Sequence, residues 1–362
     1  MAASSTEPPP PPLGEHVLGD PTLEGLARYI ETRDVRRILV LVGAGASVAA
    51  GIPDFRSPET GIYANLDKYQ LDDPTDAFSL PLLRERPEIF YTIAQEMNLW
   101  PGSFRPTAVH HFIRLLQEEG RLLRCCTQNI DGLEKAAGVS PELLVEAHGS
   151  FAAASCIDCR LPFSIEQNRL EAMQGRVSRC PSCAGIVKPN VVFFGESLPD
   201  AFFDALQHDA PVAELVIIVG TSLQVHPFAS LPCFVPKTVP RIVINRERVG
   251  GFLFRFPDDT FYTVHDGDGD GRRVGQAARV ADAAADAESS STATSSSSDG
   301  YGQYGDYDAH PAVCRDVLFR GDCQANVRRL AELLGLGAAL EALQRRSPDS
   351  AATDHKVQQQ RQ

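Results

Sequence analysis

The 362-residue sequence has no long apolar segment and no concentration of positive charge. No apolar run approaches the roughly 20 residues that a membrane-spanning helix needs, so we expect no membrane partner. The formal net charge is −13 and the basic residues form no stripe, which argues against direct nucleic-acid binding. The N-terminus, MAASSTEPPPPPLGEH, lacks the apolar centre of a secretion signal and the arginines of a mitochondrial transit peptide. We therefore expect a cytoplasmic protein, with access to the nucleus left open.

The sequence also lacks the complete fingerprint of a dinucleotide enzyme that transfers hydride. Residues 38–57, ILVLVGAGASVAAGIPDFRS, lead from an apolar strand-like run into a glycine-rich turn, which is typical of a phosphate site. Val48 occupies the position of the third glycine of G-x-G-x-x-G, and no second strand ends in an acidic residue about twenty residues later. Asp54, Phe55 and Arg56 follow the turn instead. An NAD dehydrogenase is therefore disfavoured, although a nucleotide site is not.

Six short apolar runs have the length of strands, and most are apolar on both faces, as in a parallel sheet covered by helices. They span residues 38–43, 122–127, 143–147, 191–195, 215–220 and 241–245. Helical periodicity is clearest in residues 107–120 and 322–346, where Asp322 is placed to cap the helix start. These patterns predict an α/β fold with a Rossmann-like, doubly wound parallel sheet. The polar residues after each strand are expected at its carboxyl edge, where such sheets bind ligands.

Four of the nine cysteines form two C-x-x-C pairs, Cys156 with Cys159 and Cys180 with Cys183, separated by twenty residues. Two such pairs can place four thiolates at the corners of a tetrahedron around a zinc ion. Unrelated buried thiols and a redox pair are the alternatives. Because sulfur would fill all four positions, the ion has no open site for water or substrate and is expected to be structural. The fold prediction therefore includes a small inserted zinc-binding module.

Several motifs resemble, in sequence order, those of one enzyme family. They are GAGASVAAGIPDFRS, TQNID (127–131), HG (148–149), the paired C-x-x-C motifs, KPNVVFFGE (188–196), GTSLQVHPFASL (220–231) and IN (244–245). This order is similar to that of the sirtuins, the NAD-dependent protein deacylases. The resemblance runs from about Gly25 to Gly251 and resumes at CRDVLFRGDC (314–323). It is closest to the class I deacetylase branch, which includes cytoplasmic and mitochondrial members.

The resemblance implies a transferase that cleaves nicotinamide from NAD and moves the acetyl group of acetyl-lysine to ADP-ribose. NAD is then a co-substrate, and one structural Zn²⁺ is expected. The implied partners are acetylated proteins, with histones or tubulin as family examples. A protein ADP-ribosyltransferase that uses the same cleavage is the alternative. A zinc-bearing binding module without catalysis is disfavoured because His148, Asn129 and Asp131 are retained.

Two residues carry the expected catalysis. By the resemblance, His148 takes a proton from a ribose hydroxyl, and Asn129 assists it. Because His148 follows an apolar run and precedes a glycine, we expect an exposed imidazole with an ordinary pKa near 6.5. The other histidines considered are expected to be structural: His110, His111 and His226.

The resemblance also implies the NAD contacts. Asp54 and Asp131 are expected at the nicotinamide carboxamide, with Asn129 and Ile130 as walls of its pocket. Phe55 would shield the reactive carbon, Arg56 would hold phosphate or ribose, and Gln128 would help Asn129 hold the ribose. The turn expected to cradle the pyrophosphate at a helix N-terminus comprises Gly43, Ala44, Gly45, Ala46 and Ser47. The residues expected at the adenosine half are Gly220, Thr221, Ser222, Asn245, Arg246, Glu247 and the backbone amide of Cys323.

The acylated peptide is expected to bind as an added strand between the large sheet and the zinc module. Its contacts are expected at Val192, Phe194, Gly195 and Glu196.

The segment between GGFLF and CRDV departs from the family pattern. From Asp266 to Asp308 it carries nine acidic residues against three arginines, together with a serine run, and such a composition predicts disorder. The expected organisation is a disordered proline-rich arm (1–20), the first part of the NAD-binding domain (21–149), the zinc-binding module (150–190), the second part of that domain (191–261), the disordered insertion (262–310), a C-terminal helix completing the domain (311–346) and a disordered tail (347–362).

Overall fold

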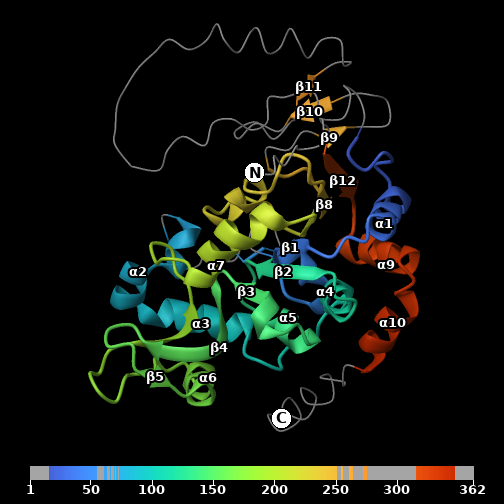
Figure 1. Ribbon diagram of the computed structural model, residues 1–362. Coiled ribbons are helices and arrows are strands. Elements are labelled where there is room, and N and C mark those ends of the chain that lie inside the picture. The colour runs from blue at the N-terminus through green and yellow to red at the C-terminus, as the bar shows by residue number, and fades with distance from the viewer. Residues whose placement is uncertain are drawn as a thin grey trace, which may run out of the picture.

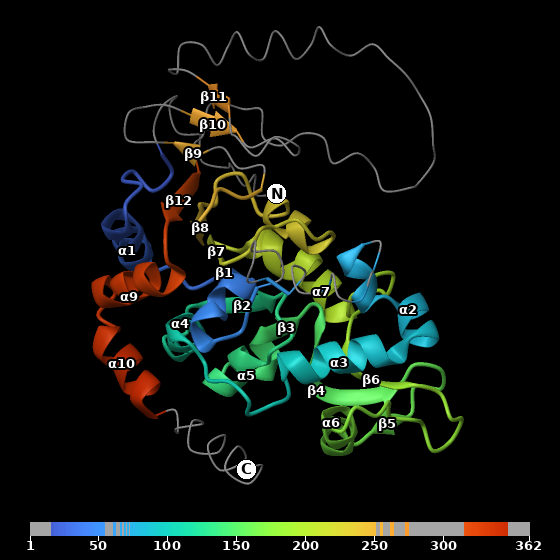
Figure 2. The same cartoon turned by 180° about the vertical axis from the view of Figure 1, so that it is seen from behind.

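The computed structural model describes residues 16–54, 61–62, 66, 69, 71, 73–250, 254–255, 261–263, 272–274 and 315–346. Figure 1 shows a large lobe built on a parallel sheet and a smaller lobe beside it, and Figure 2 gives the view from behind. The predicted site residues Phe55 and Arg56 and the predicted tail 347–362 lie outside the described residues. Within the described part, no helix has the length and apolar character needed to span a bilayer.

Six parallel strands form the main part of the large sheet, in the order β12-β8-β7-β1-β2-β3. Their bounds are β1 (Ile38–Val42), β2 (Leu122–Thr127), β3 (Leu144–Glu146), β7 (Leu215–Val219), β8 (Arg241–Asn245) and β12 (Asp316–Arg320). The sequence predicted the first five, and the structure confirms them. Strand β12 was missed, because its three apolar residues between charges form no recognisable run.

The side chains of β1 alternate between two helical layers. Ile38, Val40 and Val42 pack with α1 (Leu23–Thr32), α4 (Ala108–Glu118), α9 (Cys323–Leu333) and α10 (Gly337–Arg346). Leu39 and Leu41 pack on the other face with α7 (Asp200–Asp204) and the 3₁₀ turn η9 (Phe228–Cys233). All five side chains are at most 1% exposed. The doubly wound arrangement predicted from two-sided apolar strands is therefore confirmed, as Figures 1 and 2 show.

The two helical predictions are confirmed with one change. Residues 107–120 contain α4, and residues 322–346 contain α9 and α10 rather than one continuous helix. Gly335 adopts a φ of 72° between α9 and α10, which ends the first helix. The Asp322 side chain accepts a hydrogen bond from the amide of Ala325 at 3.0 Å and so caps α9 as expected.

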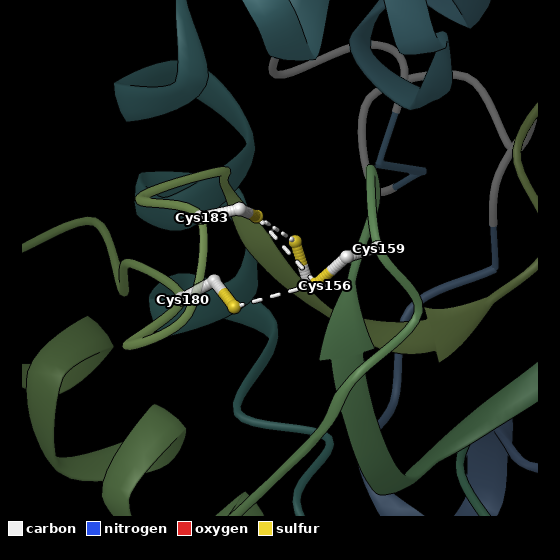
Figure 3. A group of neighbouring side chains, drawn as sticks. All are labelled: Cys156, Cys159, Cys180 and Cys183. Atoms are coloured by element: carbon white, nitrogen blue, oxygen red, sulfur yellow. Dashed lines mark hydrogen bonds between the residues drawn. The ribbon is translucent and has the colours of Figure 1, made fainter.

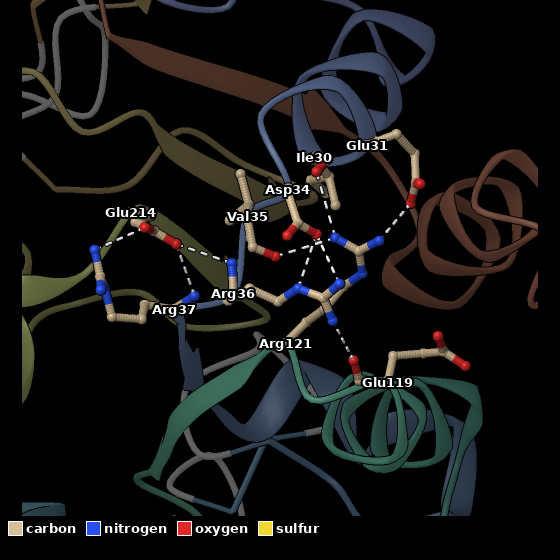
Figure 4. Close-up of polar contacts among 9 residues, drawn as sticks. All are labelled: Ile30, Glu31, Asp34, Val35, Arg36, Arg37, Glu119, Arg121 and Glu214. Carbon is tan, nitrogen blue, oxygen red and sulfur yellow. Dashed lines mark hydrogen bonds and ion pairs between the residues drawn. The ribbon is translucent and has the colours of Figure 1, made fainter.

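A cluster of charged residues joins the amino ends of β1, β2 and β7 (Figure 4). One carboxylate oxygen of Glu214 accepts the backbone amides of Arg36 and Arg37, and its other oxygen accepts the Arg37 guanidinium. Arg121 donates to the carbonyl oxygens of Ile30 and Val35. These contacts fix the sheet at the edge opposite to the carboxyl ends of its strands.

The smaller lobe contains an antiparallel sheet in the order β5-β4-β6. Its elements are β4 (Gly149–Cys156), β5 (Pro162–Phe163), α6 (Ile165–Met173) and β6 (Val187–Val191), which pack near α2 (Leu80–Glu85) and α3 (Pro87–Met97). The regular structure between residues 150 and 190 could not be recognised from the sequence. The strand β4, GSFAAASC, is rich in alanine and serine, which have no strong preference for strands.

The predicted strand at residues 191–195 is wrong. Val191 ends β6 of the small sheet, and the following residues are outside any strand, apart from a single bridge between Phe194 and Ser79. The apolar run has another cause: Phe193 is 1% exposed and packs edge-to-face against Phe78 and Phe90. Its hydrophobicity serves the core of the smaller lobe.

Two predicted disordered segments are partly ordered. His16, in the segment 1–20, is 4% exposed, and its Nε2 lies 3.4 Å from the carbonyl oxygen of Asp316. At the sheet edge, β9 (Phe254–Arg255), β10 (Phe261–Thr263) and β11 (Arg272–Val274) pair in antiparallel fashion. The sequence FYT of β10 favours a strand despite the polar composition that follows. Apart from β11 and the end of β10, the segment 262–310 lies outside the described residues.

Candidate active site

A cavity of about 490 Å³ opens at the carboxyl edge of the parallel sheet and extends to the smaller lobe. The loops that follow β1, β2, β7 and β8 supply one side of it, as expected for an open α/β sheet. It brings together these predicted NAD residues: Gly43, Ala44, Gly45, Asp54, Gln128, Asn129, Ile130, Gly220, Thr221, Ser222, Asn245, Arg246, Glu247 and Cys323. His148 and the four predicted peptide residues, Val192, Phe194, Gly195 and Glu196, also line it.

The glycine-rich turn after β1 fits closely against the loop after β7. A Cβ atom on Gly43 would lie 2.5 Å from the Thr221 Cβ, and one on Gly220 would lie 2.5 Å from the Ala46 amide nitrogen. Gly220 also has a φ of 62°, which side-chain-bearing residues rarely adopt. The glycines therefore allow the two loops to approach each other across the cavity floor.

The helix expected after this turn is absent. Two 3₁₀ turns, η1 (Ala44–Ala46) and η2 (Val48–Ala50), follow β1 before the chain reaches Pro53. An aligned α-helix dipole therefore does not support this site, and only local amide groups remain. Ala46 lines no part of the cavity, because its side chain is fully buried and its amide bonds to the Gly43 carbonyl oxygen.

A polar network lies behind the turn. Asn129 Nδ2 donates to the Gly43 carbonyl oxygen at 3.0 Å and to Ser47 Oγ at 3.2 Å. Ser47 Oγ in turn donates to Asp131 at 2.7 Å. Asn129 and Ser47 are 5% and 1% exposed, so water competes little for these bonds. The network connects the loops after β1 and β2.

A second, much smaller hollow of about 10 Å³ adjoins this network. Ser47, Asn129 and Asp131 form its polar side, and Ile52, Ile62, Met97, Leu99 and Ile130 are among its apolar walls. As it stands the hollow has room for about one water molecule. Burial raises the pKa of Asp131, although hydrogen bonds from the Leu133 amide and the Ser47 hydroxyl favour its charged form.

His148 is oriented by the backbone of the loop after β2. Its Nδ1 donates to the Gln128 carbonyl oxygen at 3.0 Å, so in the neutral ring the lone pair is on Nε2. Its ring also packs near Phe228, with 6.2 Å between the ring centroids. The expectation of an exposed imidazole with an ordinary pKa was wrong: burial lowers the pKa of His148 below 6.5, against the opposing effect of the Gln128 carbonyl.

The side of the cavity near the smaller lobe is apolar. Phe194 is 45% exposed, whereas the neighbouring Phe193 is buried. The amide of Val192 donates to the His148 carbonyl oxygen at 2.8 Å, which joins this segment to the histidine loop. The exposed Phe194 ring gives this side apolar area for a ligand, whereas the amides of Val192, Phe194 and Glu196 already donate to carbonyl oxygens of the protein.

The four cysteines of the smaller lobe converge (Figure 3). Their sulfur atoms all lie within 4.8 Å of one another, and three pairs are separated by 3.5–3.6 Å. A tetrahedral zinc ion about 2.3 Å from each sulfur requires sulfur atoms about 3.8 Å apart. The eight described cysteines form no disulfide. The geometry therefore fits the expected structural zinc.

Several cavity residues were not predicted. They include Gln224, Val225 and His226 after β7, Val249 after β8, and Gln324 at the start of α9. His226 was expected to be structural, but it lines the cavity, with its Nδ1 at 3.0 Å from Ser230 Oγ. Gln224, Val225 and His226 lie in the motif GTSLQVHPFASL. The sequence predicted ligand contacts only for its first three residues, Gly220, Thr221 and Ser222.

Comparison with known proteins agrees with this geometry. Residues 43–227 match the Sir2 family. The chain is 73% identical to the NAD-dependent protein deacetylase SIR2rp1 of Leishmania major, over 96% of this chain and 98% of that protein. It is 52% identical to the protein of the same name from Trypanosoma brucei brucei, over 90% of this chain and 92% of that protein. It is 39% identical to the NAD-dependent protein deacetylase sirtuin-2 of Danio rerio, over 96% and 82%.

Proposed function

The chain belongs to the Sir2 family, and on this basis we propose that it is an NAD-dependent protein-lysine deacetylase. It cleaves nicotinamide from NAD and transfers the acetyl group of acetyl-lysine to ADP-ribose. The observation that carries this proposal is the orientation of His148, whose Nδ1 is held by the Gln128 carbonyl at the wall of the 490 Å³ cavity. Its substrates are acetylated proteins.

His148 acts as the general base. With its hydrogen on Nδ1, the neutral ring offers Nε2 to accept the proton of a ribose hydroxyl, which then attacks the captured acyl group. Its lowered pKa keeps this nitrogen unprotonated at neutral pH. Asn129 is the second proposed catalytic residue, because its side chain already bonds to both Gly43 and Ser47 and needs no reorganisation to remain in place.

The nicotinamide carboxamide is held by Asp131 and Asp54, with Ile130 as an apolar wall. In support, Asp131 lies at the polar side of the small hollow and Asp54 lines the main cavity. Gln128 holds the ribose together with Asn129, and its side chain is positioned by a 2.7 Å hydrogen bond to Thr221. Phe55 and Arg56 keep their proposed roles as water shield and anion contact, from the resemblance of the IPDFRS motif.

The pyrophosphate lies on the turn of Gly43, Ala44 and Gly45. Ala46 supports this turn from behind, because its carbonyl oxygen accepts hydrogen bonds from Thr107 and Gln324. The adenosine half contacts Gly220, Thr221, Ser222, Asn245, Arg246, Glu247 and Cys323, all of which line the cavity.

The acetylated peptide binds between the two lobes as an added strand along Val192, Phe194, Gly195 and Glu196. The exposed Phe194 and the position of all four residues at the cavity wall support this proposal. The zinc site is closed by four thiolates, so the ion stabilises the smaller lobe and takes no part in acetyl transfer. Histones or tubulin as substrates and the cytoplasm as compartment are part of the same proposal. A reducing compartment is favoured because none of the eight cysteines that the structure describes is in a disulfide.

The experiment that tests this function measures nicotinamide release from NAD with and without an acetyl-lysine peptide. A deacetylase releases nicotinamide only when the acetylated peptide is present. Release without peptide, with labelled ADP-ribose appearing on protein, would support the ADP-ribosyltransferase instead. Formation of NADH would contradict both.

A further inference from the structure

Glu134 is a fully buried acid that the proposed mechanism does not use. It lies in α5 (Leu133–Ala137), directly after the loop that carries Asp131, and is 0% exposed. Neither of its carboxylate oxygens has a hydrogen-bond partner in the described part of the structure. A carboxylate oxygen of Glu134, one of Asp131 and a ring nitrogen of His110 all lie within 4.8 Å of one another. We call these three residues the buried cluster.

The start of α4 determines which nitrogen of His110 carries its hydrogen. The Thr107 amide donates to His110 Nδ1 at 3.1 Å, and the Thr107 hydroxyl lies 2.8 Å from the same nitrogen. Because an amide N–H can only donate, Nδ1 is an acceptor and the neutral ring holds its hydrogen on Nε2. Nε2 is buried without a partner, which leaves it as the donor that can face the two acids. Burial lowers the pKa of His110 to about 3, so the ring contributes no positive charge at neutral pH.

This tautomer argues against a metal ion in the cluster, although histidine, aspartate and glutamate are common ligands. A metal needs an imidazole nitrogen with a free lone pair. The lone pair of Nδ1 is already used by the Thr107 amide, and Nε2 carries a hydrogen. The cluster is therefore expected to bind protons rather than a metal ion.

The groups around the cluster favour a single negative charge on it. Among the described residues, the titratable side chains next to the cluster are His111 of α4, Cys125 of β2 and Glu146 of β3, with Arg114 of α4 beside His111 and Lys135 of α5 paired with Glu146. Burial keeps His111 and Cys125 neutral, and Lys135 pairs with Glu146. Arg114 donates to the Ala137 carbonyl at the end of α5 and to Glu118. No free cation remains among these groups to balance two carboxylates.

Asp131 and Glu134 differ in how well a charge is supported. Both oxygens of Asp131 accept hydrogen bonds, from Ser47 Oγ at 2.7 Å and from the Leu133 amide at 2.9 Å. The Glu134 oxygens have no hydrogen bond of comparable geometry, although the Thr127 side chain approaches them. Burial, followed by the charge of Asp131, raises the pKa of Glu134 to about 8, with the Thr127 side chain acting in the opposite direction.

We propose that Glu134 holds a proton at neutral pH and, with His110, keeps Asp131 as the single anion of the cluster, directed at Ser47 and the small hollow of about 10 Å³. Glu134 is thus a positioning residue that acts through Asp131. When Glu134 loses its proton at alkaline pH, a second buried charge repels Asp131 and disturbs the polar network. The consequence for nicotinamide binding rests on the proposed function, whereas the proton on Glu134 does not.

The proton can be observed directly in the wild-type protein by infrared difference spectroscopy. A protonated carboxylic acid has a carbonyl stretch distinct from that of a carboxylate, and we expect one such band at pH 7 that disappears with a midpoint near pH 8. The variant Glu134→Gln removes the band, because glutamine reproduces the shape of the protonated acid without the acid. The control Glu146→Gln, which removes the nearby Lys135 partner, leaves the band in place. Absence of the band in wild type, or its persistence in Glu134→Gln, overturns the proposal.

Nicotinamide inhibition gives the functional readout. If binding requires protonated Glu134, inhibition of the wild type should weaken about tenfold between pH 7 and pH 9, since about nine-tenths of Glu134 is ionised one unit above its pKa. Inhibition of Glu134→Gln should stay within about twofold over the same range. Equal pH dependence in both proteins overturns the positioning role. A wild type that shows the infrared band but cleaves no NAD would instead contradict the proposed function without contradicting the protonation of Glu134.

Discussion

Lys188 Nζ lies 3.1 Å from the Glu196 carboxylate and donates to the Val191 carbonyl oxygen at 2.6 Å. Both side chains are largely buried, at 8% and 14% exposed, and the ammonium also lies 4.6 Å from the centre of the Phe193 ring. Glu196 accepts the Phe193 amide at 2.8 Å as well. The pair therefore holds the proposed peptide-binding segment in a fixed shape at the end of β6, next to the zinc-bearing sheet.

Replacement of Lys188 by methionine should weaken peptide binding more than NAD binding. The substitution leaves the Glu196 carboxylate buried without its cation, and breaking a buried ion pair costs about 3–5 kcal/mol. We expect the KM for an acetylated peptide to rise at least about tenfold while the KM for NAD changes by less than about threefold. Steady-state kinetics with each substrate varied in turn would measure both.

The matched control is Arg160→Met. Arg160 also points at Glu196, but at 3.9 Å and with its side chain 70% exposed, so its contribution is small. Equal effects of the two substitutions, or an unchanged peptide KM in Lys188→Met, would show that the buried pair does not shape the peptide site.

Loss of the proposed base should abolish most catalysis without abolishing binding. We expect His148→Ala to lower the deacetylation rate by roughly 10²–10⁴-fold, which is typical of a lost general base, while NAD binding measured by calorimetry persists. His208→Ala is the control, because this exposed histidine bonds only to its own helix at Asp204 and lines neither cavity. Near-normal turnover by His148→Ala would rule out the assignment.

The acid limb of the pH profile should reflect the lowered pKa of His148. The base works when neutral, so kcat/KM falls as the pH drops through that pKa, which burial places below 6.5. At pH 6.5 we therefore expect more than half of the plateau kcat/KM. An acid limb centred at or above pH 6.5 that persists when the other histidines are replaced would contradict this expectation. It would mean that burial does not lower the pKa of His148 in the free enzyme.

Removal of one zinc ligand should unfold the smaller lobe. Cys180→Ser leaves three thiolates, and because binding energy at a structural site is folding energy, metal content and protease resistance should fall together. Metal analysis and limited proteolysis would measure both. Cys233→Ser, at an exposed cysteine outside the cluster, should keep one zinc per chain. A Cys180→Ser protein that retains its metal and resists protease would contradict the four-thiolate site.

Much of the large lobe could be predicted because its strands are buried on both faces. A run such as residues 215–219 is apolar at every position, so it is recognised as a strand buried on both faces. The residues that follow such strands, at the edge of the sheet, carry the recognisable motifs. The run at 191–195 is also apolar, yet only its first residue, Val191, is in a strand, since aromatic packing rather than sheet burial explains it. The composition of a short apolar run does not identify the element that packs against it.

Other features depend on contacts between segments that are distant in sequence. Strand β12 is joined to β8 by a buried ion pair in which Arg241 Nε lies 2.6 Å from Asp316. The long insertion separates these two residues in the sequence, so their contact could not be predicted from the sequence alone. The burial of His148 depends in part on the neighbouring Phe228 ring, and the tautomer of His110 depends on Thr107. The motifs named the residues of the site, but their protonation follows from packing.

The central claim is tested most directly by the stoichiometry of one reaction. Purified wild-type protein is incubated with NAD and an acetyl-lysine peptide, and mass spectrometry follows nicotinamide, deacetylated peptide and acetylated ADP-ribose. The proposed function predicts that the three products form in equal amounts and that none forms when either substrate is omitted. Deacetylation without NAD consumption, or nicotinamide release with ADP-ribose attached to protein and the acetyl group still on the peptide, would contradict it.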